Sequence, residues 1–259
     1  KGAFYSDISN LNGHNAPEPD TLRNFTVGAQ IAMDFYRHYQ YTGDGAFLTE
    51  KVVPMMRQCM GLYASLLSKG EDGRYRIKDG STAYESYWNL RETLTDHAAI
   101  RALLNAIFSI EEKMGLSQEE AARYRDIQEN LYDYITEEIT HHGKELRIFT
   151  AGQKWDLTPV KYGEGEYPLS PFPAALFSMV YPSGLIGLAQ RQEPVYISAC
   201  NTARVLFDNE IYTLGRLGCS GHAPAPQMAA RLGMGEDAGK IIRHYAQTYQ
   251  IFPNGFMHF

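Results

Sequence analysis

The stretch YRHYQYTGDGAFLTEKVVPMM, residues 36–56, places a Gly-Asp-Gly turn between two runs of apolar and aromatic residues. On both sides these residues recur at helical spacing. They are Ile31, Phe35, His38 and Tyr39 before the turn, and Leu48, Val52, Met55, Met56, Cys59, Leu62 and Leu66 after it. Gly43 is a typical helix stop and Asp44 a typical N-cap, which predicts two antiparallel helices. Pro54 is expected to divide the second helix into a short lead and a longer body.

A second helical hairpin is expected further along the chain. Its two apolar stripes are Ile100, Leu103, Leu104, Ile107 and Phe108, then Ile127, Leu131, Tyr134 and Ile135. The first helix is expected to end near Gly115, and Ser117 with Glu120 forms a capping-box pattern that starts the next one. Weaker helical patterns follow at 173–181, 194–209, 223–232 and 236–250, and short strand patterns occur at 73–77 and 145–149. The fold class is therefore mainly α.

The bulk composition excludes several classes of function. Nucleic acid is a poor candidate partner because the net charge is −6 and the basic residues form no cluster. No apolar run is long enough to span a membrane. Cys59, Cys200 and Cys219 fit neither a disulfide framework nor a zinc site, so buried thiols are expected. We find no linker that divides residues 1–259, which predicts a single domain, and the oligomeric state is left open.

The order of the connections indicates where function should be sought. Tight turns near 43 and 116 alternate with long links at 70–94 and 141–171. In an antiparallel helix array every second connection lies at the same end, so both long links are expected on one rim. Among the carboxylates and tryptophans that this rim would hold are Glu85, Trp88, Trp155, Asp156, Glu164 and Glu166.

The segment GSTAYESYWN, residues 80–89, sets Glu85 among Tyr84, Tyr87 and Trp88. Apolar neighbours raise a carboxyl pKa, which suits the general acid of a glycoside hydrolase, and aromatic rings suit sugar binding. The alternative is that Glu85 is a solvated loop acid and that the aromatic residues only cover the helix ends. Asp96 follows at a helix start, where capping of the helix is the expected role.

Metal and nucleotide chemistry have little support. His141 and His142 lie near Glu145, but a second group of ligands at a known spacing is lacking, and capping of helix carbonyls is the alternative. The sequence contains no GxSxG motif, no P-loop and no GxGxxG motif. We therefore expect no metal and no cofactor.

Four stretches together resemble the catalytic domain of glycoside hydrolase family 95, an (α/α)6-barrel family that includes α-L-fucosidases and α-L-galactosidases. They are residues 36–56 quoted above, GSTAYES (80–86) with LTDHAAIRALLNAIF (94–108), SPFPAALFSMVYPSGLIGL (170–188) and MAARLGMGEDAGKIIRHYAQ (228–247). The resemblance implies a six-hairpin barrel and a general acid at Glu85. Tyr84, Tyr87, Trp88 and Trp155 are then the candidate sugar-binding residues.

The chain also departs from the family pattern. The Ser-Pro-Glu of the family is Ala83-Tyr84-Glu85 here, and Leu169, Ser170 and Pro171 replace its histidine pair. By the resemblance, the Asn-rich segment would lie before residue 1 and the catalytic base after residue 259. With fewer helices than a closed barrel needs, residues 1–259 are expected to form a partial barrel without turnover of their own.

The resulting hypothesis is an inverting exo-glycosidase, secreted or periplasmic as is usual for the family it resembles, with a carbohydrate as its substrate. Two alternatives stay open: a glycoside phosphorylase of the same clan and a non-catalytic helical carbohydrate-binding domain. If the base lay within the chain, the best candidates would be Asp156, Glu164 and Glu166.

Overall fold

The computed structural model describes residues 2–5, 23–78, 80–83, 89–153, 175–208, 225–249 and 252–254 in full, and residues 160–162, 165–167 and 173–174 by their backbone. The chain forms two compact units. Unit 1 comprises Lys1–Ala83, Tyr87–Tyr134 and Gly152–Lys154, and unit 2 comprises Tyr84–Ser86, Ile135–Ala151 and Trp155–Phe259. That the whole chain is one domain stays a prediction.

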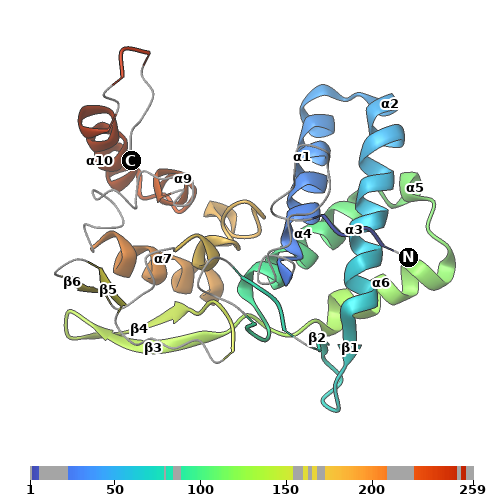
Figure 1. Cartoon of the computed structure of the whole chain (residues 1–259), viewed down its shortest axis with the longest axis horizontal. Helices are drawn as coiled ribbons and strands as arrows, with labels where there is room; N and C mark the ends of the chain where they lie inside the picture. The colour runs from blue at the N-terminus through green and yellow to red at the C-terminus, as the bar shows by residue number, and fades with distance from the viewer. Residues whose placement is uncertain are drawn as a thin grey trace. The chain divides into compact units, whose positions relative to one another are not determined.

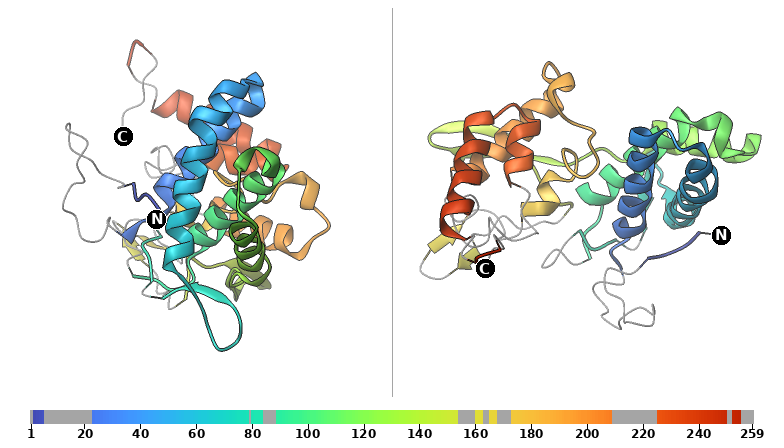
Figure 2. Two further views of the ribbon diagram at one scale, coloured as in Figure 1. Left: turned by 90° about the vertical axis from the view of Figure 1, so that its right-hand side faces the viewer. Right: turned by 90° about the horizontal axis from the view of Figure 1, so that it is seen from above.

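Unit 1 begins with the first expected hairpin. Its elements are α1 (Thr26–Thr42), α2 (Gly45–Phe47), the π-helical turn η2 (Leu48–Val52) and α3 (Val53–Leu66). Gly43 adopts a left-handed conformation, with φ of 68°, and its N–H donates to the Tyr39 carbonyl. The Asp44 side chain accepts from the Phe47 N–H at 2.9 Å. Both expected caps are confirmed, and α1 and α3 lie side by side (Figures 1 and 2).

The second hairpin is confirmed as well. It consists of α4 (Leu94–Ser109), the short α5 (Glu111–Met114) and α6 (Gln118–Asn130). Ser117 and Glu120 form the expected capping box, since each side chain accepts from the other residue's backbone N–H. Arg57 of α3 donates to Glu120 at 2.9 Å and to the Gly115 carbonyl at 2.8 Å. One guanidinium thus joins the start of α6 to the first hairpin.

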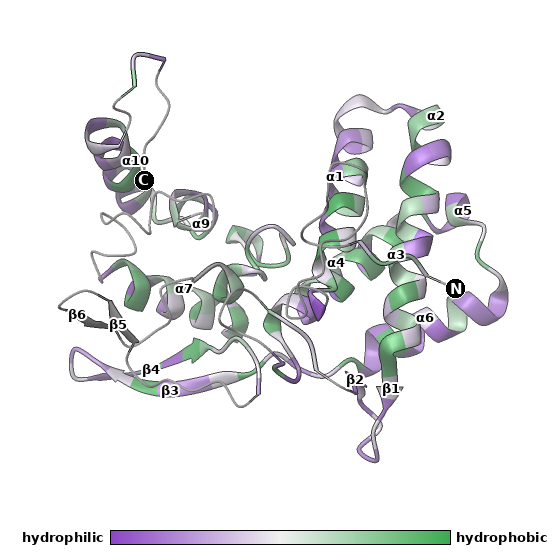
Figure 3. Ribbon diagram, in the orientation of Figure 1, coloured by the Kyte–Doolittle hydropathy of each residue, from purple (hydrophilic) through white to green (hydrophobic). Residues whose placement is uncertain are grey.

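The core of unit 1 lies between these helices. Most of its large, fully buried side chains come from α3, α4 and α6 and the residues that follow α6. They include Met56, Met60, Tyr63, Ile100, Leu103, Leu104, Ile107, Ile127 and Leu131. Figure 3 shows α4 mostly in green and α6 with much purple. A helix that is apolar on most sides is one that neighbours cover on most sides, so α4 is the central element of the unit.

The last expected stripe runs past the true end of its helix. Helix α6 ends at Asn130, and Leu131 is extended, with φ of −63° and ψ of 144°. Leu131 forms a parallel bridge with Tyr75, and the Tyr132 N–H donates to the Tyr75 carbonyl at 3.1 Å. Pairing with the hairpin of β1 (Leu67–Lys69) and β2 (Tyr75–Ile77) therefore replaces the last helical turn.

Unit 2 is built on a strand hairpin. Its elements are β3 (Thr136–His141), β4 (Lys144–Phe149), β5 (Val160–Tyr162), β6 (Gly165–Tyr167), the 3-10 helices η3 (Pro173–Phe177) and η4 (Leu188–Gln190), α7 (Pro194–Phe207), α9 (Ala225–Arg231) and α10 (Gly235–Thr248). Helix α7 packs on β4, where the Phe149 N–H donates to the Thr202 hydroxyl at 2.9 Å. Pro194 opens α7 as expected.

Three other sequence-based expectations concern a helix, the cysteines and membrane-spanning segments. The helix expected over 173–181 is a 3-10 helix that ends at Phe177. Cys59 is buried and Cys200 half-buried, both as free thiols, while Cys219 lies outside the described residues. Within the described part of the chain, no helix has the length and apolar character to cross a membrane.

Candidate functional site

The residues that the sequence singled out for catalysis and sugar binding fall on parts of the chain outside the described residues. They are Glu85, Tyr84, Tyr87, Trp88, Trp155, Asp156 and Glu164, whereas Glu166 is described only by its backbone in β6. The two segments that flank the Glu85 loop, residues 80–83 and 89–93, are described in full. We call them the loop stem, and the candidate site is built from them.

The two sides of the loop stem pair with each other. Ser81 and Leu90 form an antiparallel bridge in which each N–H donates to the other carbonyl, at 2.8 and 2.9 Å. The Thr82 N–H donates to the Arg23 carbonyl at 3.0 Å, and the Arg23 guanidinium donates to the Gly80 carbonyl at 2.9 Å. These bonds close the loop at its base and tie it to the segment that leads into α1.

Gly80 is required at the start of the stem. Its φ is 77°, a left-handed conformation that favours glycine. A Cβ atom at this position would lie 2.8 Å from the Leu90 carbonyl oxygen. On the other side of the stem Asn89 and Glu92 also have positive φ, of 54° and 51°. Conformations of this kind are uncommon outside glycine, and they persist where surrounding contacts hold them.

A buried carboxylate, Asp96, lies beneath the stem. It is fully buried and accepts three hydroxyl hydrogen bonds: from Ser81, from Thr93 at 2.6 Å and from Tyr63 at 3.0 Å. Ser81 and Thr93 belong to the two sides of the stem, and Tyr63 belongs to α3. One carboxylate therefore joins both sides of the loop stem to the core of unit 1.

Asp96 does not cap its helix as expected. Thr93 is the N-cap of α4, and its hydroxyl accepts from the Asp96 N–H at 3.3 Å. Burial raises the pKa of Asp96, and the hydrogen bonds from Ser81, Thr93 and Tyr63 act in the opposite direction. Because its side chain is enclosed, Asp96 is not accessible to a substrate in this conformation. Its hydrogen bonds hold the two sides of the stem together, and Glu85 stays the predicted general acid.

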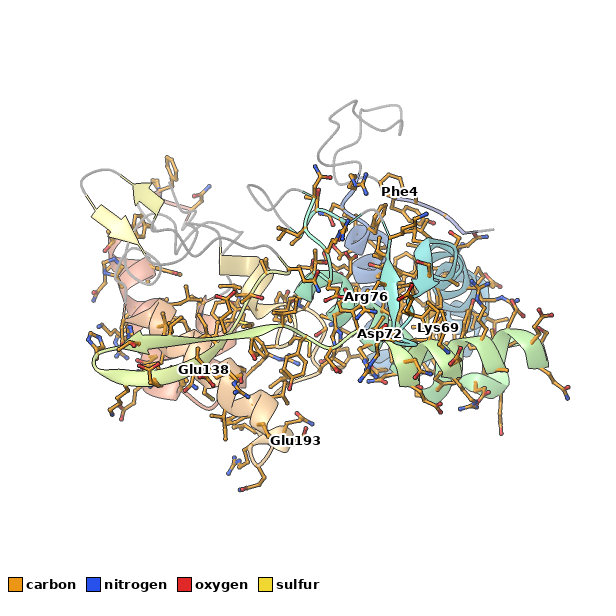
Figure 4. All side chains as sticks on the ribbon, turned by 90° about the horizontal axis from the view of Figure 1, so that it is seen from below. Phe4, Lys69, Asp72, Arg76, Glu138 and Glu193 are labelled. Atoms are coloured by element: carbon orange, nitrogen blue, oxygen red, sulfur yellow. The ribbon has the colours of Figure 1, made fainter. Side chains whose placement is uncertain are left out.

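The stem also meets the second long link. The Gln153 N–H donates to the Arg91 carbonyl at 2.7 Å, and the Gln153 amide donates to Glu92. Glu92 accepts from Arg76 as well, and Arg76 is paired with Asp72 in the β1–β2 hairpin, where both side chains are labelled in Figure 4. At this point Gln153 of the second long link lies beside the loop stem, and the placement of both links on one rim stays a prediction.

A second buried pair supports the start of α4. His97 Nδ1 lies 2.8 Å from the Tyr132 carbonyl oxygen, and the Tyr132 hydroxyl donates to the Thr93 carbonyl at 2.8 Å. Burial, followed by the charge of Arg101, lowers the pKa of His97 to about 4. The imidazole is therefore neutral near neutral pH, and in the tautomer with a proton on Nδ1 it donates to Tyr132.

Sequence reasoning missed Tyr63, Tyr132 and the inward role of Asp96. The Tyr63–Asp96 contact joins residues 33 positions apart, and the His97–Tyr132 contact joins residues 35 positions apart. Helical periodicity predicts which face of a helix is apolar, but it does not predict which polar group on another element will meet it. The one available signal was a cluster of hydroxyl residues on either side of the aromatic loop.

One cluster among the described residues has the chemistry of a metal site. It comprises His141, His142 and Asp208 of unit 2, whose candidate ligand atoms all lie within 4.8 Å of one another. Glu145, which the sequence placed beside the two histidines, is not part of it. His141 pairs with Lys144 across a strand hairpin, and alternation turns the next residue, Glu145, to the other face, where it accepts from Thr140.

The helix hairpins of unit 1 and the loop that they anchor define the class of protein. It is a helical-hairpin protein in which a connection between helices carries the candidate site. The particular family follows from comparison. The family model described as "Glycosyl hydrolase family 95 catalytic domain" matches residues 1–145, more than half of the chain. The chain belongs to glycoside hydrolase family 95, and so to a family of proteins that process glycosidic bonds.

A solved structure supports the fold. The chain described as "Putative kojibiose phosphorylase from human microbiome" matches with a TM-score of 0.60 at 13% sequence identity. The match covers 95% of this chain and 38% of that one. No curated protein matches. The expected fold class, mainly α and of the six-hairpin glycosidase type, is confirmed, and the chain spans well under half the length of the structure that it matches.

Proposed function

We propose that this chain carries the general acid, Glu85, of an inverting exo-glycosidase that acts on glycans. The observation that carries the proposal is the anchored loop stem, in which Asp96 binds hydroxyls on both sides of the loop. A general acid acts only within hydrogen-bond reach of the leaving oxygen, so the loop that holds it must keep a defined position. The described contacts of the stem hold both ends of the loop in place.

The remaining roles follow from the chemistry of inversion. Tyr84, Tyr87, Trp88 and Trp155 would stack on the sugar and exclude water, which keeps the acid protonated near neutral pH. An opposed carboxylate, about 6.5–9.5 Å from the acid, would activate the attacking water. Family resemblance assigns that base to an aspartate beyond residue 259, and the candidates within the chain are Asp156, Glu164 and Glu166.

The role of Glu85 can be tested by varying the leaving group. In the natural protein that contains this chain, Glu85→Gln should slow hydrolysis of aryl glycosides with basic leaving groups by about 10²–10⁴-fold. Activated nitrophenyl leaving groups depart without protonation, so their glycosides should be affected far less. The basic limb of the pH–rate profile should also disappear, because the group that must stay protonated is gone.

Glu71→Gln is a matched control, because Glu71 is an exposed glutamate in the turn between β1 and β2. It should leave all rates unchanged. An equal loss for every leaving group, or no loss, would remove Glu85 as the acid. NMR of the first product should show the inverted anomer, and retention would contradict the inverting assignment.

A phosphorylase is the second candidate, favoured by the solved structure that the chain resembles. It would consume inorganic phosphate and release a sugar 1-phosphate, and turnover would cease without phosphate. A hydrolase would be indifferent to phosphate. A non-catalytic sugar-binding domain would bind oligosaccharides in calorimetry without turnover under either condition.

A further inference from the structure

The tip of the β3–β4 hairpin in unit 2 carries two adjacent histidines. His141 is the last residue of β3 and pairs with Lys144, and between them His142 and Gly143 form the turn, with φ of 48° and 73°. Positive φ at both central residues is typical of the tightest hairpin turns, in which Asn, Asp and Gly are the usual residues. Here the first of these positions holds an imidazole.

Asp208 completes the cluster from another element. It follows the last residue of α7 and lies 67 positions from His141. His141 Nε2 is 2.9 Å and His142 Nε2 is 3.7 Å from the same carboxylate oxygen, Oδ2 of Asp208. The two imidazole rings are 4.2 Å apart, between centroids. Two imidazole nitrogens thus converge on one carboxylate oxygen.

A hydrogen bond between His141 and Asp208 accounts for only part of this arrangement. It needs one imidazole, and it gives no reason for a second ring to lie beside the same oxygen. Nitrogen and oxygen ligands of a tetrahedral zinc ion lie about 2.0–2.1 Å from the metal and so about 3.3 Å from one another. The two separations from Asp208 Oδ2, 2.9 and 3.7 Å, lie on either side of that value.

We propose that His141, His142 and Asp208 bind a divalent transition-metal ion of the Zn²⁺ type. Two imidazoles and a carboxylate favour such an ion over Mg²⁺ or Ca²⁺, which prefer all-oxygen sites. The ion would crosslink the tip of the β3–β4 hairpin to the end of α7. The His142 side chain is 75% exposed, so water can occupy the remaining coordination positions. The proposal does not depend on the proposed glycosidase activity.

Two substitutions of proposed ligands and two control substitutions separate metal binding from packing. His142→Ala removes the most exposed of the three side chains, and Asp208→Asn keeps the shape of the carboxylate while weakening its ligand oxygen. Lys144→Ala is the matched control, because Lys144 is the exposed residue that pairs with His141 and lysine is not a usual zinc ligand. His244→Ala, in α10, controls for binding of zinc by histidines elsewhere.

The experiment uses residues 1–259 without a polyhistidine tag, stripped of metal with a chelator and then titrated with Zn²⁺ by calorimetry. Co²⁺ serves as a visible-absorption probe of coordination. We expect one zinc ion per chain in the wild type, Lys144→Ala and His244→Ala, together with a rise in melting temperature. His142→Ala and Asp208→Asn should lose both effects while circular dichroism shows that the fold is kept.

Binding that persists with unchanged affinity in both His142→Ala and Asp208→Asn would overturn the proposal. So would a wild-type chain that binds no zinc at micromolar concentrations. If either variant lost its fold, Co²⁺ spectra of the other would decide the question.

Discussion

At the scale of single residues, Asp96 shows how a buried carboxyl group can support a loop whose tip it does not belong to. Its three hydroxyl donors come from three different segments, Ser81, Thr93 and Tyr63, all of them buried. Removing a buried acceptor leaves its donors without partners, which costs more than the hydrogen bonds contribute. Asp96 should therefore matter for stability and for the Glu85 loop together.

We predict that Asp96→Ala lowers the free energy of unfolding by about 3 kcal/mol or more, and that Asp96→Asn, which keeps one acceptor oxygen, costs less. Urea unfolding followed by circular dichroism provides the measurement. Asp34→Ala is the control, because Asp34 is exposed and pairs only with Arg37 of the same helix in the described contacts. Its effect should stay within about 0.5 kcal/mol. Equal losses for Asp34→Ala and Asp96→Ala would refute this role.

His97 makes the stability of unit 1 depend on pH. Its pKa is about 4 in the folded chain and about 6.5 when unfolded. Between these values the unfolded state binds a proton that the folded state does not, so the free energy of unfolding falls as the pH is lowered through this window. From about pH 7 to about pH 5 the loss due to His97 should be about 2 kcal/mol.

The contribution of His97 is isolated by comparing urea unfolding of the wild type and His97→Gln at both pH values. The variant should be less stable at pH 7 but should lose about 2 kcal/mol less on acidification. His38→Gln, at an exposed position of α1, controls for the effect of a His-to-Gln substitution as such. If wild type and His97→Gln respond identically to pH, the folded imidazole is not held neutral.

At the scale of elements, the loop stem depends on one glycine. Gly80 and Gly73 have the same φ of 77°, but a Cβ atom at Gly73 would have no neighbour within 4 Å, whereas at Gly80 it would collide with the Leu90 carbonyl. Gly73→Ala should therefore lower the free energy of unfolding by about 1 kcal/mol, because of the left-handed conformation alone. Gly80→Ala should cost distinctly more, because the Ser81–Leu90 bridge has to open.

Thermal unfolding compares the two alanine variants directly, and glycosidase assays of the natural protein report on the loop. Gly80→Ala should lose activity, and Gly73→Ala should keep it. Similar melting temperatures and similar activities for the two variants would show that the close approach at Gly80 has no consequence.

The elements that the sequence predicted correctly are those with local signals. Gly43 and Asp44 end and start helices through contacts with residues three or four positions away, as does the capping box at Ser117. The predicted end of α6 was wrong by several residues, because Leu131 is extended and pairs with Tyr75 and so does not continue the helix. That competition depends on tertiary structure, which a periodic pattern does not contain.

At the scale of the whole molecule, the sequence motifs were sufficient to predict the fold class and the family. Residues 1–145 belong to a catalytic domain of glycoside hydrolase family 95, and the helical fold resembles that of a much longer chain. The site was predictable only as a loop. The contacts that anchor that loop, such as Tyr63 with Asp96 and Gln153 with Arg91, join distant positions, so no spacing rule could have found them.

The closure of the loop at Ser81 and Leu90 has a consequence for diversification. The backbone hydrogen bonds between Ser81 and Leu90 use no side chain of residues 84–88, so we expect that these five residues can be replaced together. Libraries that keep Glu85 and randomise its neighbours should yield folded proteins at high frequency. Related sequences could then acquire new sugar preferences through changes in residues 84–88. The helices that anchor the loop would be selected separately, for stability.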